Sequence, residues 1–375
     1  MINVFNPVLK HLKLDNICID NNVFRLHYKV TVILLIVFSI VVTSKQYIGD
    51  PIDCISTAGI KRETFNTYCW IFSTYTVIDH DGSKLKSLLH ALFHHPSLTH
   101  CFCFKVKEEL PHKYYQWVSF VLVLQAGMFY LPRYMWKCWE NGRIKALTQN
   151  LVGPLVIEEE CTTDRKNYLL NYLSEKGNQT HTFYAIRFVI CEILNFANVV
   201  GQFFMVNLFL GGKFVNYGPA VSTFLSKNFL FDTDMSNNDP MSRIFPKTAK
   251  CTLTDYGPSG TKQIKDALCV LPLNIVNEKL YALLWFWFVG LALLSGLALL
   301  YRVIVFSCAE VRVWLLLAQT KNISKGLIRS LVYSRHAGDW FILQQLYKNL
   351  HPDVFQDIIS DLCSESECDT NTVIL

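Results

Sequence analysis

One stretch of the chain is rich in residue types that could bind a metal ion. It contains His90, His94, His95, His100, Cys101 and Cys103. Because His90 and His94 are four residues apart, a helix would place both imidazoles on one face, an arrangement that suits zinc. Histidines also titrate near neutrality and could sense pH. The spacing matches no strong ligand signature, so a solvated loop is the favoured interpretation, and we predict no bound metal and no cofactor.

Cysteine is the second residue type with chemical potential. Two long polar segments contain Cys54, Cys69, Cys101, Cys103, Cys251 and Cys269. Disulfides persist outside the cell and are rare in the cytosol, which predicts that both segments are extracellular. Six cysteines allow fifteen pairings, and Cys101 and Cys103 are too close to bond each other without strain. The other four form the expected framework, in which bonds between the two segments would clamp them together.

The sequence contains no recognisable catalytic motif. It has no P-loop, no G-x-G-x-x-G after a strand, no G-x-S-x-G and no H-E-x-x-H. We therefore do not expect an enzyme. The formal net charge of +5 is modest and gives no indication of a nucleic-acid partner.

The composition indicates a membrane protein. Hydrophobic residues make up 51% of the chain and charged residues 17%, and the mean hydropathy is +0.24. A bilayer core of about 30 Å needs roughly 20 apolar residues per helix. The stretches predicted to meet this requirement are residues 28–46, 113–132, 184–211 and 280–303. This pattern predicts an all-α membrane protein, a four-transmembrane-helix bundle with disulfide-clamped extracellular loops containing short β-strands and with a helical cytoplasmic domain.

The four spans define the remaining segments. These are a cytoplasmic amino-terminal helix at 1–27, extracellular loops at 47–112 and 212–279, a cytoplasmic loop at 133–183 and a cytoplasmic tail at 304–375. Most arginines fall on the proposed inner side, which supports this orientation with both termini in the cytoplasm. The tail is predicted to be helical until it becomes acidic after about residue 362, where we expect disorder.

Local patterns give more specific predictions. Ile2 and Phe5 begin an apolar helical face, which suits either a helix on the membrane surface or one folded into a pore mouth. Pro132 is predicted to kink or stop the second span. The segment 69–77 is aromatic and β-branched, so it could form a short strand.

Four polar side chains share one face of the third span. They are Glu192, Asn195, Asn198 and Gln202. Such groups either line a water-filled path or form hydrogen bonds between packed helices. Hydrogen bonding between helices is the favoured interpretation.

An ordered series of motifs resembles a known family. The second span begins with the pentapeptide Tyr114, Tyr115, Gln116, Trp117 and Val118. Further motifs lie at residues 45–54, 245–251, 256–260 and 269–275. These residues resemble the innexins, the invertebrate gap-junction proteins related to pannexins, whose signature pentapeptide is complete here. The resemblance extends over residues 1–362.

The resemblance implies a gap-junction channel subunit. A ring of about six to eight subunits would surround a pore in the plasma membrane and dock with a ring in the adjacent cell, so that ions and small metabolites pass between cytoplasms. Other innexins are further candidate partners. The implied disulfides are Cys54–Cys269 and Cys69–Cys251. The implied pore candidates are Ile2, Phe5, Lys45, Asp50 and Asp53.

The first extracellular loop departs from the usual innexin pattern. Innexins usually carry two cysteines in this loop, whereas four are present here, and residues 95–100 lack the usual glycine-rich character. Two alternatives therefore stay open. One is an undocked hemichannel that releases small solutes, and the other is a cell–cell adhesion or scaffold subunit without an open pore.

Overall fold

The computed structural model describes most of the chain. The described residues are 17–55, 61–72, 74–79, 107–112, 114–149, 151, 159–174, 179–230, 240–320 and 323–372. They fall into two compact units. Unit 1 comprises residues 1–32, 127–200 and 290–375, and unit 2 comprises residues 33–126 and 201–289. The pore candidates Ile2 and Phe5 and the stretch 90–103, with its histidines and Cys101 and Cys103, lie outside the described residues.

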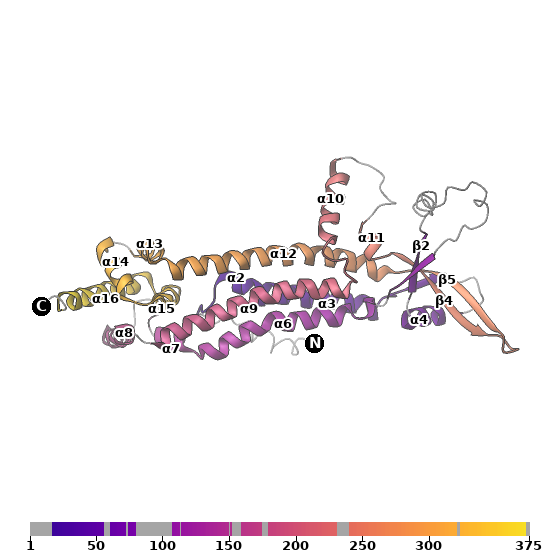
Figure 1. Cartoon of the computed structure of the whole chain (residues 1–375). Coiled ribbons are helices and arrows are strands. Elements are labelled where there is room, and N and C mark those ends of the chain that lie inside the picture. The colour runs from indigo at the N-terminus through magenta and orange to yellow at the C-terminus, as the bar shows by residue number, and fades with distance from the viewer. Residues whose placement is uncertain are drawn as a thin grey trace, which may run out of the picture. The chain divides into compact units, whose positions relative to one another are not determined.

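Four long helical segments correspond to the predicted spans (Figure 1). Their elements are α2 (Asn22–Arg25), η2 (Leu26–Thr31) and α3 (Val32–Tyr47), which form one segment, then α6 (Val118–Glu140), α9 (Gln179–Phe209) and α12 (Pro272–Ser307). All four segments are long and apolar enough to cross a membrane. The predicted four-span helical fold is therefore confirmed.

Helix α6 continues through Pro132, so the helix does not stop at this proline. A proline inside a helix costs about 3 kcal/mol because it removes one hydrogen bond and crowds the preceding turn. The turn that follows it contributes Arg133 and the fully buried Trp136 to contacts with the amino-terminal part of unit 1. These contacts offset the cost of the proline and keep the turn helical.

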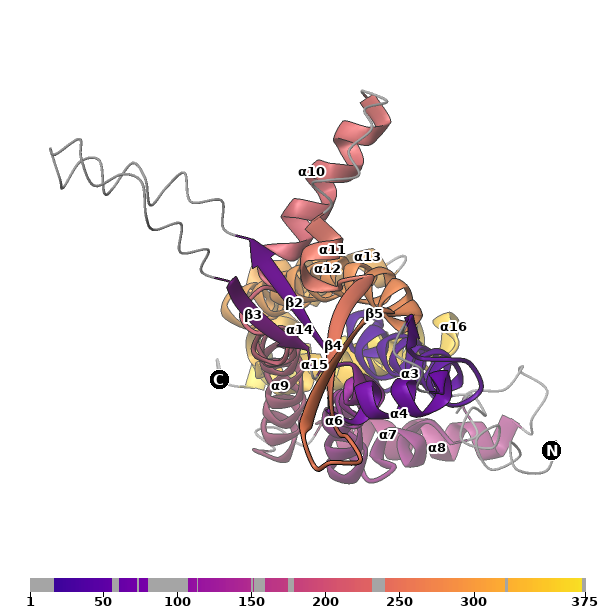
Figure 2. The ribbon, with the colours of Figure 1, turned by 90° about the vertical axis from the view of Figure 1, so that its right-hand side faces the viewer.

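Unit 2 contains a five-stranded antiparallel sheet in the order β1-β5-β4-β2-β3 (Figure 2). The strands are β1 (Asp53–Ile55), β2 (Thr74–Asp79), β3 (Lys107–His112), β4 (Thr248–Tyr256) and β5 (Lys262–Val270). Unit 2 also contains α4 (Arg62–Phe72), η3 (Tyr114–Gln116), α10 (Tyr217–Leu230) and α11 (Pro240–Ile244). The sheet takes strands from both loops that the sequence predicts to be extracellular.

A tight turn joins β4 to β5. The Gly257 amide donates to the Thr261 carbonyl at 2.9 Å, and the Gly260 amide donates to the Gly257 carbonyl at 2.8 Å. Gly260 has φ +74°, a conformation that residues with a Cβ rarely adopt. The glycines of the motif at 256–260 are thus explained by the turn that sets the register of the hairpin.

The strand predicted for residues 69–77 is correct only in its second half. Cys69 and the residues up to Phe72 belong to α4, and β2 begins at Thr74. Phe65 and Cys69 are four residues apart and both are buried, so they form the apolar face of a helix that packs on the sheet. The β-branched residues of the strand begin only after this helix.

Unit 1 is built around α15 (Ala337–Tyr347), in which most side chains are buried. The other short helices are α7 (Arg143–Thr148), α8 (Glu159–Ser174), α13 (Ala309–Gln319), α14 (Lys325–Ser334) and α16 (Pro352–Thr372). A helix that is apolar on nearly all sides must be surrounded by other elements. In α15, Trp340, Phe341 and Leu343 pack in the largest described core of unit 1.

Helix α16 continues to Thr372, beyond the position where we expect disorder from the acidic composition. Phe355, Ile358, Ile359 and Leu362 bury one face of its first half in the core of unit 1. Once packing has formed the first turns, adding further residues to a helix costs little. Helix initiation by tertiary packing therefore overrides the local composition after residue 362.

The backbone of α9 lies very close to a glycine of α15, and this contact yields a prediction. A Cβ on Gly338 of α15 would lie 2.6 Å from the backbone nitrogen of Thr182 and 2.7 Å from its Cα. We expect Gly338→Ala to force α15 away from α9 and to lower stability by about 1–3 kcal/mol. The measurement is the thermal unfolding midpoint of the purified protein. Gly326→Ala, in an exposed position with open space around the glycine, is the matched control and should leave the midpoint unchanged or slightly raised.

Candidate functional site: the disulfide clamp and the amino-terminal strap

Two disulfides join the loop between α3 and α6 to the loop between α9 and α12. Cys54 is bonded to Cys269 and Cys69 to Cys251, across 215 and 182 residues of chain. These are the two bonds that the resemblance implies. In the chain-entropy model, closing one loop of this length stabilises the folded state by about 5 kcal/mol. We refer to the two bonds and the sheet around them as the disulfide clamp.

The secondary structure explains why these cysteines pair. Cys54 and Cys269 are directly opposite each other in β1 and β5, while Cys69 lies on α4, which packs against Cys251 of β4. All four cysteines are buried. The sulfur atoms of Cys54, Cys69 and Cys269 lie within 4.8 Å of one another. Because each sulfur is bonded to another cysteine, this cluster offers no thiolate to a metal ion.

The signature pentapeptide connects α6 to the disulfide clamp. Tyr115 is buried and its ring centroid lies 4.8 Å from that of Trp70, the residue that follows Cys69 on α4. The side-chain amide of Gln116 donates to the Trp70 carbonyl. Tyr114 donates to the Ile244 carbonyl at 3.3 Å, just before β4. The pentapeptide thus positions α4 and the segment before β4 against the start of α6.

The last two residues of the pentapeptide differ in exposure. Val118 is fully buried, whereas the side chain of Trp117 is 60% exposed. The exposed indole therefore contributes little to the core and is free to meet lipid or another subunit.

Of the three described pore candidates, Asp53 is already paired. Arg62 Nε donates to Asp53 Oδ1 at 2.8 Å, and a second guanidinium nitrogen bonds the other carboxylate oxygen. Lys45, in the last turn of α3, and Asp50 are both exposed. The charge of Asp53 is thus largely balanced by Arg62, a partner that the sequence does not reveal.

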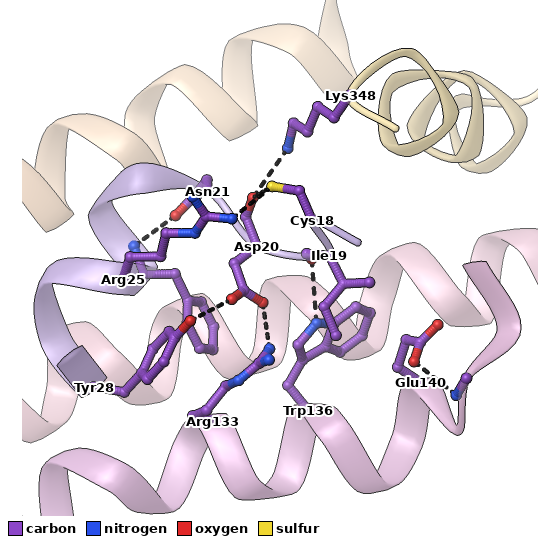
Figure 3. Close-up of polar contacts among 12 residues, drawn as sticks. Cys18, Ile19, Asp20, Asn21, Arg25, Tyr28, Arg133, Trp136, Glu140 and Lys348 are labelled. Carbon is purple, nitrogen blue, oxygen red and sulfur yellow. Dashed lines mark hydrogen bonds and ion pairs between the residues drawn. The ribbon is translucent and has the colours of Figure 1, made fainter. Parts of the chain in front are cut away.

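Four consecutive residues before the first span form a second polar site (Figure 3). We call residues 18–21 the amino-terminal strap. Cys18 bonds Asn349, the Ile19 carbonyl accepts from Trp136, Asp20 bonds Arg133, and Asn21 bonds Glu192. The strap therefore joins α6, α9 and the end of α15 within unit 1.

Asp20 supplies the single carboxylate of the strap, and this carboxylate is buried. The exposed fraction of Asp20 is 3%. Figure 3 shows the carboxylate between the hydroxyl of Tyr28, which donates at 2.8 Å, and the guanidinium of Arg133. A buried carboxylate is tolerated only when it is paired and hydrogen-bonded, and both conditions are met here. The Arg133 guanidinium also lies 4.9 Å from the centre of the Tyr28 ring, so each of the three side chains contacts the other two.

Asn21 connects the strap to an ion pair between two spans. Its Oδ1 accepts from the Phe24 amide at 2.6 Å and caps α2, while its Nδ2 donates to Glu192 Oε1 at 2.6 Å. Glu192 of α9 in turn accepts two hydrogen bonds from Arg302 of α12, at 2.9 and 2.8 Å. A bidentate pair of this kind fixes both the distance and the orientation of the two helices.

Aromatic rings enclose the Arg302 guanidinium. It lies 5.3 Å from the ring centres of both Phe188 and Phe341 and 5.9 Å from that of Phe306. Cation–π attraction and the carboxylate of Glu192 together compensate the removal of this charge from water. Arg302 therefore joins α9, α12 and α15 at one point.

The polar face predicted on the third span includes this ion pair. Glu192, Asn195 and Gln202 are all buried. For Glu192 the structure shows hydrogen bonds to other segments of unit 1, which agrees with the interpretation that these groups hold helices together. A small cavity lies beside it, lined in part by Asn195, His27 and Ser295.

Sequence analysis did not identify Asp20, Asn349 or the pairing of Glu192 with Arg302. Two signals could have indicated part of this site. An Asp-Asn pair directly before a span is a strong helix-cap signal. An isolated glutamate in one apolar run and an arginine in another also favour a direct pair, because neither charge is stable alone in a membrane.

The features described so far define a class of protein. Four helices are long and apolar, two polar loops are cross-linked into one sheet, and the third loop and the tail form short helices. The chain is a four-span membrane protein with two covalently clamped loops.

Known relatives identify the family. Residues 20–366 match the family model described as Innexin. The chain is 48% identical over 372 residues to Innexin inx2 of Schistocerca americana, covering 98% of this chain and 99% of the relative. It is 47% identical over 374 residues to Innexin inx2 of Drosophila melanogaster, covering 99% and 98%. It is 39% identical over 369 residues to Innexin shaking-B of the same organism, covering 97% and 95%. The chain belongs to the innexin family, and it is a gap-junction channel subunit.

The ion pair between α9 and α12 yields a second prediction. Arg302→Leu would leave Glu192 buried without its main partner, which costs about 3–5 kcal/mol, so we expect little folded protein at the membrane. A double variant that also carries Glu192→Leu lacks the unpaired carboxylate and should restore much of the folded protein at the membrane. The measurement is surface biotinylation together with the thermal unfolding midpoint.

The matched control for this prediction is Arg329→Leu. Arg329 pairs with Glu310, and both side chains are more than half exposed. Exposed pairs contribute about 0–1 kcal/mol, so this variant should be delivered normally. Equal losses in Arg302→Leu and Arg329→Leu would contradict the role assigned to the buried pair.

Proposed function

We propose that this innexin forms a ring of about six to eight copies in the plasma membrane and that rings of adjacent cells dock. Ions and small metabolites then pass between the cytoplasms by passive permeation, without catalysis or a cofactor. The observation that carries the proposal is the disulfide clamp, which makes two distant loops into one sheet. A docking surface must keep its shape, and cross-links between distant segments supply this rigidity.

The state of the cysteines supports the orientation in which both termini are cytoplasmic. Within the described part of the chain, the bonded cysteines all belong to unit 2. Described cysteines that carry no disulfide bond include Cys18, Cys138, Cys191 and Cys308, and all four belong to unit 1. Disulfides form in oxidising compartments, whereas cytosolic thiols stay reduced. We therefore place the sheet outside the cell and the short helices of unit 1 in the cytoplasm.

The β4–β5 hairpin is the proposed docking element. Tyr256, Ile264 and Leu268 are 69%, 65% and 49% exposed. Apolar side chains grouped on the exposed part of a cross-linked hairpin suit contact with another protein. In this proposal they meet the docked ring of the adjacent cell, formed by this chain or by another innexin.

The proposed conduit has charged and apolar parts. We assign Lys45, Asp50 and Asp53 to the outer mouth. We assign Ile2 and Phe5, which lie outside the described residues, to the cytoplasmic mouth. Membrane lipid covers the outer faces of the spans. On this assignment the net charge at the outer mouth depends on how completely Arg62 balances Asp53.

Recordings from paired cells test the docking proposal. We expect junctional conductance when both cells express only this chain, and we expect Cys54→Ser to abolish it because Cys269 loses its partner and the clamp is opened. Cys138→Ser, which changes an exposed free cysteine of unit 1, is the matched control and should couple normally. Surface biotinylation establishes that each variant reaches the membrane.

The other outcomes of the same experiment contradict the proposal in different ways. Current in single cells without coupling between pairs would indicate an undocked hemichannel. Normal delivery to the membrane with neither single-cell current nor coupling between pairs would indicate an adhesion subunit or a requirement for a second innexin. Normal coupling in Cys54→Ser would show that docking does not need the clamp.

Selectivity gives a separate prediction. Arg62→Gln removes the charge that balances Asp53, so the outer mouth becomes more negative and the cation-to-anion permeability ratio should rise roughly twofold or more. The measurement is the reversal potential under a salt gradient. Lys265→Gln, which breaks the 2.8 Å pair with Asp255 on the hairpin, is the matched control and should leave the ratio unchanged. An unchanged ratio in Arg62→Gln would remove Asp53 from the conduit.

A further inference from the structure

One charged side chain lies on the exposed, apolar side of the third span. On the part of α9 that belongs to unit 1, the exposed apolar side chains include Phe183, Ile186, Ile190 and Ile193. They recur at spacings of three and four, as one face of a helix does. Arg187 is also exposed, four residues after Phe183 and three before Ile190, so it lies on the same side of the helix. Within the described part of the chain, Arg187 forms an ion pair with no carboxylate.

Contacts within unit 1 place this part of α9 level with two other spans. Trp136 of α6 contacts Phe188 of α9, with ring centroids 4.9 Å apart, and the Arg302 guanidinium of α12 lies 5.3 Å from the centre of the same Phe188 ring. Tyrosines lie close to these contacts on the exposed faces, where Tyr134 is 58% and Tyr301 is 47% exposed. Exposed tyrosines of membrane spans concentrate at the level of the lipid headgroups. The three helices therefore cross the boundary of the bilayer near Phe188.

The exposed residues farther along the three helices support this boundary. Beyond the apolar faces, the first exposed polar residues are Lys137 on α6, Thr182 on α9 and Ser307 on α12. All three lie within about two helical turns of the level of Phe188. Five residues separate Thr182 from Arg187, which corresponds to about 7 Å along the helix axis. The backbone of Arg187 is thus on the membrane side of the boundary, while its own charge requires a polar partner.

The direction of the helix lets the guanidinium reach that boundary. Side chains of a helix tilt toward its amino-terminal end, and α9 begins at Gln179 in unit 1. The long apolar stem of an arginine can remain among lipid chains while the charged group extends to the headgroup layer. The acceptors of that layer are lipid phosphates. A guanidinium matches a phosphate in shape and charge, with two parallel hydrogen bonds.

We propose that Arg187 binds the phosphate of an anionic phospholipid in the inner leaflet and so fixes the depth of α9 in the membrane. Anionic headgroups are concentrated in that leaflet, and their net negative charge complements an arginine that has no carboxylate partner. A fixed depth also protects the buried ion pair of Glu192 with Arg302, which lies about one turn farther along α9. The proposal rests on the proposed function in one respect, the orientation that places unit 1 on the cytoplasmic side.

The test measures lipid binding to the purified full chain in a neutral detergent. The probes are dioleoylphosphatidylserine, dioleoylphosphatidylcholine and dioleoylglycerol, which has no phosphate, and native mass spectrometry gives the apparent dissociation constant of the first lipid bound per subunit. We expect phosphatidylserine to bind most tightly and dioleoylglycerol most weakly. Arg187→Gln removes the charge and should weaken phosphatidylserine binding roughly tenfold or more. Arg187→Lys keeps the charge without the planar fork and should give an intermediate affinity.

Arg329→Gln is the matched control. Arg329 is an exposed arginine of unit 1 that lies on α14 and pairs with Glu310. This variant should bind phosphatidylserine as the parental chain does. Equal affinity in Arg187→Gln and the parental chain overturns the proposal. Inorganic phosphate that binds as tightly as phosphatidylserine overturns the choice of a lipid. Loss of subunit association in Arg187→Gln with unchanged lipid affinity also overturns it and assigns this face to a second copy of the chain.

Two further measurements keep the result decisive. Where Arg187→Gln does not fold, Arg187→Lys carries the test, and an unchanged affinity in that variant overturns the bidentate contact. The orientation is tested separately in intact cells, where a membrane-impermeant maleimide should not label the exposed Cys138 of unit 1. Labelling would overturn the orientation in the proposed function and with it the choice of the inner leaflet. The lipid affinities of the purified chain would still decide whether Arg187 binds a phosphate.

Discussion

The buried ion pair of Glu192 and Arg302 is the interaction on which the helical unit depends. Neither charge would be stable by itself between apolar helices, so each requires the other, and their two hydrogen bonds fix α9 against α12. The paired carboxylate still has capacity to accept a hydrogen bond from Asn21, which begins the first span. One ion pair therefore joins α9 to α12 and, through Asn21, to the start of the first span.

The two units are stabilised by different kinds of interaction. Unit 2 is held by disulfides, which constrain the unfolded chain and do not open under oxidising conditions. In unit 1 the strap is held by hydrogen bonds and ion pairs, each with a modest net free energy that thermal motion or a voltage can overcome. The shape of unit 2 is therefore fixed covalently, whereas the contacts of the strap are all non-covalent.

At three places the tertiary structure overrides what the local sequence favours. The aromatic and β-branched residues from Cys69 onward could form a short strand, yet packing of Phe65 and Cys69 on the sheet makes the first part of this segment a helix. Pro132 marks a helix end in most soluble proteins, but the contacts of Arg133 and Trp136 with the strap keep α6 intact beyond it. The acidic end of α16 stays helical because Ile358 and Leu362 are anchored in the core before it.

The sequence by itself determined the number of spans, the helical class, the family and the cysteines available for cross-linking. These properties are encoded locally, by the length of apolar runs, by the types of residue between them and by ordered short motifs. Only the tertiary structure decided that Arg62 balances Asp53, that Arg302 belongs to Glu192, and that Asn349 holds Cys18 across 331 residues of chain. The physical reason is that a polar group can be satisfied by any suitable partner within hydrogen-bond distance. Which partner the polar group meets depends on the packing of whole helices rather than on its neighbours in the sequence.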